Sequence, residues 1–189
     1  MGNQALLIMD MQNGIVERFA KNAEPLLETL SSALEAARVH GVTVIFVRVA
    51  FREGVPEVSA RNKSFSALVG SLSMDETSHS TQIHDRLAPR SGELLITKRR
   101  VSAFAGSDLD VVLRSKDIDS LVLCGIATSG VVLSTLRQAA DLDFVLTVLS
   151  DGCADADPEV HRVLTEKVFA RQATVLTTPE WIGQLTTAR

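Results

Sequence analysis

Short, almost continuously apolar runs, separated by stretches with helical spacing, constrain the fold of this chain more than any other feature. The clearest run is VTVIFVRVA at residues 42–50, which is rich in β-branched residues and apolar at nearly every position. A strand that is apolar on both sides is typical of a parallel sheet covered by helices on both faces. The run therefore predicts a central strand of an α/β protein.

Runs of the same kind recur along the chain. We expect strands at residues 5–9, 42–50, 93–97, 121–124, 144–149 and 173–178. Apolar residues at helical spacing predict helices at 26–41, 107–113, 131–142, 158–171 and 179–185. This alternation predicts a three-layer α/β/α sandwich around a six-stranded, mainly parallel, doubly wound (Rossmann-like) sheet.

Length, composition and charge narrow the class of protein. The chain has 189 residues, of which 46% are hydrophobic and 22% are charged, as expected for one globular domain spanning residues 1–189. A net charge of −4, with no basic cluster beyond KRR at 98–100, argues against binding to nucleic acid. No window reaches the roughly 18 apolar residues of a membrane span. We therefore expect a cytoplasmic protein that binds neither nucleic acid nor membranes.

The cysteines and histidines predict neither a disulfide framework nor a metal site. Cys124 and Cys153 form no CxxC pair, and we expect both to pack as small hydrophobic residues. The four histidines do not lie at ligand spacing. We expect no metal and no cofactor.

Two charged residues stand where predicted strands end, and ligands of such sheets bind beyond the carboxyl ends of the strands. Asp10 directly follows ALLIM, and Lys98 follows LLIT. At a common sheet edge they would form an ion pair, which should lower the pKa of Asp10. Taken singly, Asp10 is equally consistent with a turn cap, and Lys98 with a solvated charge.

Residues 51–92 make an unusually long connection between two predicted strands. The segment is polar and contains several glycines and prolines, so we expect irregular structure there. Loops of this length are often functional lids. Substrate specificity would be determined in this region, which includes Arg52, Arg61, Asn62 and Phe65.

Three motifs resemble those of the isochorismatase-like hydrolase (cysteine hydrolase) superfamily, each in or after a predicted strand. They are LLIMDMQNG at 6–14, TKRRVSAF at 97–104 and VLCGIATSGVV at 122–132. In that family an Asp, a Lys and a Cys form a triad that attacks amides or related carbon–nitrogen bonds. The resemblance implies that Asp10 and Lys98 are catalytic, and it places Val131 at the position of the cysteine. Because valine has no thiol, it implies a hydrolase without a cysteine nucleophile.

The resemblance implies a substrate site as well. The turn after the fourth strand would have a cis peptide between Ile126 and Ala127, and its backbone amides would bind an anion. Either Arg99 or Arg100 would clamp a substrate carboxylate, whereas Thr128 taken alone predicts a helix cap. The expected substrate-binding residues are Gln12, Phe51, Arg100, Phe104, Ile126, Ala127, Thr128, Gly130 and Val131.

Two functions stay open on the sequence. One is hydrolysis of a small anionic metabolite such as a vinyl ether, with Asp10 as general acid and Lys98 as electrostatic partner, because some isochorismatases of the superfamily also lack the cysteine. A substrate carboxylate near Lys98 would then raise the pKa of Asp10. The other is a catalytically silent member that binds a metabolite or a protein partner in the same pocket. The resemblance also implies a homo-oligomer, either a dimer or a tetramer.

Overall fold

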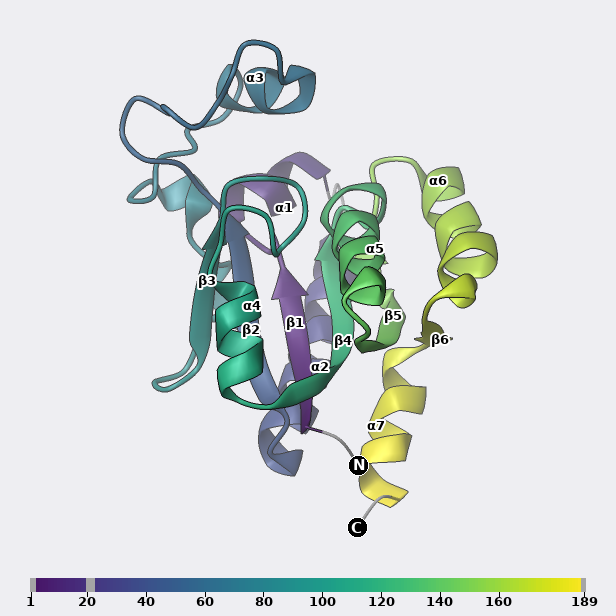
Figure 1. Cartoon of the computed structure of the whole chain (residues 1–189). Coiled ribbons are helices and arrows are strands. Elements are labelled where there is room, and N and C mark those ends of the chain that lie inside the picture. The colour runs from purple at the N-terminus through teal and green to yellow at the C-terminus, as the bar shows by residue number, and fades with distance from the viewer. Residues whose placement is uncertain (1–2, 20–22, 188–189) are drawn as a thin grey trace.

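The computed structural model describes residues 3–19 and 23–187, which form a six-stranded sheet flanked by helices (Figure 1). The strand order is β3-β2-β1-β4-β5-β6, and all neighbouring strands are parallel. The strands are β1 (Asn3–Met9), β2 (Thr43–Val49), β3 (Leu94–Lys98), β4 (Ile118–Ile126), β5 (Val145–Ala154) and β6 (Thr174–Leu176). The predicted α/β sandwich is confirmed.

Helices cover both faces of the sheet. α4 and α5 lie on one face, and α2 lies on the other with α7 beside it (Figure 1). The helices are α1 (Asn13–Phe19), α2 (Glu24–His40), α3 (Lys63–Val69), α4 (Leu109–Ser115), α5 (Leu133–Asp141), α6 (Pro158–Val163) and α7 (Thr178–Thr187). Short 3₁₀ turns lie at His79–Thr81, Asp85–Leu87 and Phe169–Arg171, and π-helical turns at Thr128–Val132 and Leu164–Val168.

The apolar spacing that predicted α2 also explains how α2 packs. Its buried residues recur on one face, which contacts the sheet: Leu26, Leu27, Leu30, Ala33, Leu34 and Ala37. Gly41 ends the helix with φ +70°, and its N–H donates to the carbonyl groups of Ala37 and Arg38. Glycine adopts this left-handed conformation without the steric cost of a Cβ atom.

The topology places the site at the carboxyl ends of the central strands. From β1 the chain crosses to β2 on one side of the sheet, and it later returns to pair β4 with the other side of β1. Such a reversal of strand order leaves a crevice beyond the carboxyl ends, where ligands of open α/β sheets bind. Asp10 follows β1, and Lys98 is the last residue of β3.

Two strands extend further than the sequence predicted. β4 continues through Gly125, where we had predicted its end, because Gly125 pairs with Met9 on one side and with Cys153 on the other. β5 continues past Leu149 to Ala154 for the same reason. The expected end of the strand at residue 124 is therefore wrong. Glycine can occupy a strand position with φ +128°, which other residues rarely adopt.

Residues 51–76, here called the cover segment, rise above the carboxyl ends of the strands and carry α3 (Figure 1). The expectation of irregular structure is wrong for α3, which Asn62 caps by accepting the N–H of Phe65 at 3.1 Å. Phe51 and Phe65 pack edge to face with ring centroids 5.6 Å apart. With Val49 and Met74 they form an apolar cluster separate from the main core.

The C-terminal third follows the predicted order of elements with local changes. Asp157 caps α6 by accepting the N–H of Glu159 at 2.9 Å, and Pro158 is the first helical residue. The predicted helix at 158–171 is broken into α6, a π-helical turn and a 3₁₀ turn. Within residues 3–19 and 23–187, no helix has both the length and the apolar character needed to cross a membrane.

Candidate active site

Asp10 occupies the first position after β1 in an uncommon backbone conformation. Its φ is +54°, and its N–H donates to the carbonyl of Val47 at 2.8 Å. Asp adopts this left-handed region more readily than most residues. The hydrogen bond to β2 holds the residue at the sheet edge, so the position of the carboxylate is set by the two central strands.

Lys98 meets Asp10 in a buried ion pair. Nζ of Lys98 lies 2.9 Å from Oδ2 of Asp10, and the two side chains are only 2% and 9% exposed. Nζ also donates to the carbonyl of Arg100 at 3.1 Å. Among the described residues, Oδ1 of Asp10 is buried and has no hydrogen-bond partner. The predicted ion pair is confirmed.

Burial raises the pKa of Asp10 above its ordinary value. The positive charge of Lys98 and its hydrogen bond act in the opposite direction, but the cost of removing the carboxylate from water is larger. The lowered pKa expected from the ion pair alone is therefore wrong. The Asp10 carboxyl group keeps its proton to a higher pH than a solvated aspartic acid does.

A cavity of about 210 Å³ lies over this pair. Its wall is mostly apolar, and its lining residues are Asp10, Ile15, Val49, Ser64, Phe65, Leu68, Lys98, Val101, Ile126, Ala127, Gly130 and Val131. Those that we had predicted as site residues are Asp10, Lys98, Ile126, Ala127, Gly130 and Val131. The added members come from α1, β2, α3 and the loop after β3, and of these only Phe65 had been named as part of the specificity region.

Gln12 and Phe51, which we expected to bind substrate, lie outside the cavity lining. The Gln12 side-chain amide is fully buried, with its nitrogen donating to the carbonyl of Val49 and its oxygen accepting the N–H of the same residue, both at 2.9 Å. Phe51 packs against Phe65 in the apolar cluster of the cover segment. Both side chains support the cavity wall from behind.

Arg100 and Phe104 also lie outside the lining, as does Arg99. The exposed guanidinium of Arg100 donates to the carbonyl of Arg99 at 2.6 Å, and the Arg99 side chain turns toward the cover segment. Phe104 packs near Phe144, with ring centroids 6.0 Å apart. No arginine of the described residues therefore reaches the cavity as a carboxylate clamp.

The turn after β4 contains the cis peptide bond between Ile126 and Ala127. Several of its amides already have acceptors within the protein. Ser129 N–H donates to Oδ2 of Asp155 at 2.7 Å, and the N–H groups of Gly130 and Val132 donate to the carbonyl of Ala127 at 3.0 and 3.3 Å. Fewer amides are thus available for an anion than the sequence led us to expect.

Thr128 faces away from the cavity toward α6. Its hydroxyl lies 2.8 Å from Nδ1 of His161, and it caps no helix, so the expected helix cap is wrong. Burial lowers the pKa of His161, while the nearby carboxylate of Asp155 opposes that shift. Asp155 and His161 therefore brace the turn from outside the cavity.

Neither cysteine is a candidate nucleophile. Cys124 lies within β4, where its thiol donates to the carbonyl of Leu7 at 3.3 Å, and Cys153 lies within β5. Burial raises the pKa of Cys153 to about 12 and that of Cys124 well above its ordinary value. Because the thiolate is the reactive form, both thiols are poor nucleophiles at neutral pH. Both are buried, as expected.

The structure offers no metal centre and one larger hollow as alternatives to this cavity, as far as the described residues show. Across the described parts of the chain, no three His, Cys, Asp or Glu side chains gather in a group that could hold a metal ion. A larger hollow of about 810 Å³ lies along the start of α3, between Ser59 and Ala67. Its lining holds no carboxylate, whereas the smaller cavity holds the Asp10–Lys98 pair. We therefore take the smaller cavity as the candidate active site.

Comparisons with known proteins concern the whole chain and identify its family. A sequence model described as "Isochorismatase domain" matches residues 4–180. Ureidoacrylate amidohydrolase RutB of Stutzerimonas stutzeri is 31% identical over 201 residues, which cover 95% of this chain and 77% of that protein.

Solved structures share the fold. A cysteine hydrolase from Pseudomonas syringae pv. phaseolicola superposes with a TM-score of 0.90 at 24% identity, covering 99% of this chain and 94% of that one. N-carbamoylsarcosine amidase from Thermoplasma acidophilum gives a TM-score of 0.77 at 25% identity, covering 93% and 96%. The family match over nearly the whole chain, together with these relatives, shows that the protein belongs to the isochorismatase family of hydrolases.

Proposed function

We propose that this protein hydrolyses a small anionic metabolite, such as a vinyl ether, without a cysteine nucleophile. Asp10 acts as the general acid, and Lys98 is its electrostatic partner and the binding site for the anionic group. Val131 holds the place where other family members carry the cysteine. The remaining apolar lining binds the body of the substrate, and the cavity of about 210 Å³ fits only a small molecule.

The state of the Asp10 carboxyl group carries this proposal. Its Oδ1 is buried without a partner among the described residues, and its pKa is raised by burial. A carboxyl group that keeps its proton closer to neutral pH can donate that proton to a substrate. When Asp10 is protonated, the ammonium group of Lys98 has no ionised carboxylate beside it. It is then free to pair with a substrate anion, whose negative charge would raise the pKa of Asp10 further.

The proposed reaction needs only Asp10 and water. The carboxyl group protonates the terminal carbon of the vinyl ether, and the electrons of the double bond form the new C–H bond. Water attacks the resulting oxygen-stabilised cation and releases one proton to the Asp10 carboxylate, which restores the acid. The hemiketal then breaks into an alcohol and a ketone. Because the cation forms before attack, no thiolate is required.

The amide-hydrolysing relatives suggest a second class of substrate. RutB is named for the hydrolysis of ureidoacrylate, and the Thermoplasma protein for that of N-carbamoylsarcosine. Attack on an amide needs a strong nucleophile, and the cavity lining supplies no thiol. A silent family member that only binds a metabolite or protein partner is the remaining alternative. One experiment can test amide hydrolysis and the silent alternative together.

The test is turnover of a panel of isochorismate-like vinyl ethers and small amides by wild type and Asp10→Asn. We expect the wild type to release a ketone from a vinyl ether, with a rate that falls as pH rises through the raised pKa of Asp10. Asp10→Asn should lose at least about 100-fold in kcat, the usual size of a general-acid contribution. Asp141→Asn, an exposed change of the same type on α5, is the matched control and should retain the rate.

Turnover of a vinyl ether that is equal in wild type and Asp10→Asn would contradict the acid role. No turnover of any panel member by the wild type, together with saturable binding of one of them, would instead support the silent alternative. Hydrolysis of the amides alone would show that the substrate class is wrong.

The assignment of Val131 to the nucleophile position has its own test. In Val131→Cys the introduced thiol would share the cavity with Lys98, whose positive charge lowers the pKa of a neighbouring thiol. We expect iodoacetamide to modify this thiol at pH 7 at least about tenfold faster than either buried native cysteine. Mass spectrometry of the modified peptides measures the rates. An introduced thiol as inert as the native ones would contradict the assignment, and new amide hydrolysis would strengthen it.

A further inference from the structure

We propose that Arg99 is a positioning residue that holds the cover segment, and with it one wall of the cavity, over the Asp10–Lys98 pair. That wall consists of Ser64, Phe65 and Leu68. Arg99 does not line the cavity itself, so its effect on a bound molecule would pass through the segment that it holds.

The cover segment is closed at a narrow neck. Phe51 N–H donates to the carbonyl of Met74 at 2.8 Å, and Glu76 N–H donates to the carbonyl of Phe51 at 3.0 Å. These two hydrogen bonds flank Asp75, which pairs with Phe51 in an isolated parallel bridge. The two ends of the segment therefore lie side by side, and we call this contact between Phe51 and residues 74–76 the neck. Side chains that bind the neck determine the position of α3 above the sheet.

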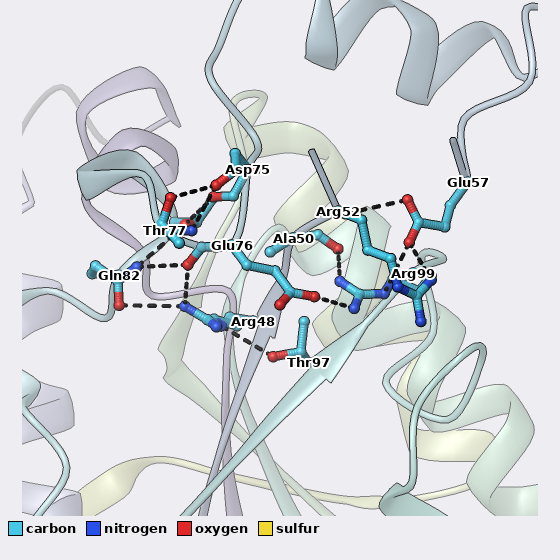
Figure 2. Close-up of polar contacts among 11 residues, drawn as sticks. Arg48, Ala50, Arg52, Glu57, Asp75, Glu76, Thr77, Gln82, Thr97 and Arg99 are labelled. Carbon is cyan, nitrogen blue, oxygen red and sulfur yellow. Dashed lines mark hydrogen bonds and ion pairs between the residues drawn. The ribbon is translucent and has the colours of Figure 1, made fainter. Parts of the chain in front are cut away.

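Figure 2 shows the Arg99 guanidinium at this neck. It donates to the carbonyl of Ala50, just before the segment, and to the carboxylate of Glu76 at its end. Its Nε lies 3.7 Å from Oε1 of Glu57, inside the segment. One planar fork of N–H donors thus donates to both sides of the neck and forms a third, ionic contact inside the segment, a geometry that suits arginine and that lysine cannot reproduce.

These contacts tie the cover segment to the strand that carries Lys98. Arg99 directly follows Lys98, and the Lys98 carbonyl accepts the N–H of Ala50 at 3.4 Å. From the other side, Arg48 donates to the carbonyl of Glu76 at 3.2 Å and to Oγ1 of Thr97 at 3.1 Å (Figure 2). Glu76 is therefore held by two arginines, one within β2 and one directly after β3. The Arg99 side chain is only 17% exposed, so solvent screens its ion pairs less than those of a surface pair.

The apolar cluster beneath α3 also holds the cover segment, but in a different way. Phe51, Phe65, Val49 and Met74 bury apolar surface, which favours contact without fixing a direction. Charge-assisted hydrogen bonds fix direction as well as distance. Loss of Arg99 should therefore loosen the segment at its neck while the apolar cluster keeps the protein folded.

A looser cover segment has a consequence for Asp10 that rests on the proposed function. Burial raises the pKa of Asp10, and a wall that opens more often admits water to the carboxyl group. In Arg99→Gln the fall in rate with rising pH should then begin at lower pH than in the wild type, and KM should rise.

The main test needs no substrate. Hydrogen–deuterium exchange followed by mass spectrometry is compared in wild type, Arg99→Gln and Arg52→Gln. Arg52 is the matched control, because it also pairs with Glu57, at 2.7 Å, but belongs to the cover segment itself and is 69% exposed. We expect the amides of α3 to exchange about tenfold faster in Arg99→Gln and less than about twofold faster in Arg52→Gln. Amides of β1 should be unchanged in both, and Arg99→Lys should be intermediate.

Glu76→Gln removes the charge of the other partner in this ion pair, whose side chain is 38% exposed. It replaces Arg99→Gln in the test if that variant unfolds. It should speed exchange in α3 to a similar degree, and the double variant should add little to either single one. Exchange in α3 that is equal in wild type, Arg99→Gln and Glu76→Gln would overturn the proposal, as would an equal increase in Arg52→Gln. Because exchange is measured without substrate, this result stands whether or not the vinyl ethers are hydrolysed.

Discussion

At the scale of single residues, Asp10 shows how far charge patterns alone can be trusted. Its position after an apolar strand correctly predicted a pairing with Lys98, which lies 2.9 Å away. The direction of its pKa shift was wrong, because a sequence shows which charges meet but not how much water is lost. In the folded protein the cost of desolvation exceeds the attraction of Lys98, and this balance raises the pKa of Asp10.

The raised pKa of Asp10 predicts a pH dependence of stability. A raised folded-state pKa means that the native state binds more protons than the unfolded state above about pH 3.8, so the contribution of Asp10 falls as pH rises. Relative to Asp10→Asn, the free energy of unfolding of the wild type should be greatest at low pH. It should decrease by about 1.4 kcal/mol for each unit by which the pKa is raised.

Urea unfolding of both proteins between pH 3.5 and 8, in steps of about half a pH unit, measures the difference between their free energies of unfolding. The difference should level off above the folded-state pKa of Asp10. If it instead grew with rising pH, the Lys98 charge would outweigh burial, and Asp10 would be a weaker candidate for the acid.

At the scale of elements, the contact between β1 and β4 depends on Gly125. A Cβ atom added there would lie 1.9 Å from the carbonyl oxygen of Met9, and the residue has φ +128°. Neither backbone can move without disturbing the pairing next to Asp10. We expect Gly125→Ala to lower the free energy of unfolding by about 3 kcal/mol or more, from steric overlap and backbone strain together.

Gly183→Ala is the matched control for this change. Gly183 lies in α7, and an added Cβ would meet no atom within 4 Å, so alanine should be neutral or should stabilise by up to about 1 kcal/mol. Chemical denaturation of the three proteins gives both values. A loss below about 1 kcal/mol in Gly125→Ala would show that the two strands can separate locally at little cost.

The length of a helix or strand affected whether it could be predicted from the sequence. Long runs such as 42–50 and the apolar face of α2 carry enough periodic positions to be recognised. α1 and α3 have only 7 residues each and were not predicted. Helices so short are marginal in isolation and form because tertiary packing holds them. α3, for example, is held through Phe65, which packs against Phe51.

At the scale of the whole molecule, the cavity assembles side chains from segments that the sequence keeps far apart. The motifs predicted Asp10, Lys98 and the turn at 126–131, because each stands at a strand end and parallel strands bring those ends to one edge. They did not predict Ile15 or Leu68, which reach the cavity through α1 and α3. Gln12 and Arg100 lie outside the cavity lining, since proximity in sequence to Asp10 or Lys98 does not determine where a side chain points.

The sequence by itself therefore determined the layered fold, the strand ends and the meeting of one carboxylate with one ammonium group, because periodicity and strand order depend on local patterns. Only the tertiary structure decided the depth of burial of Asp10, the course of the cover segment and the direction of each arginine. Those properties depend on packing between distant segments, and Arg99 shows this most clearly: it adjoins Lys98 in the chain but points to Glu57 and Glu76.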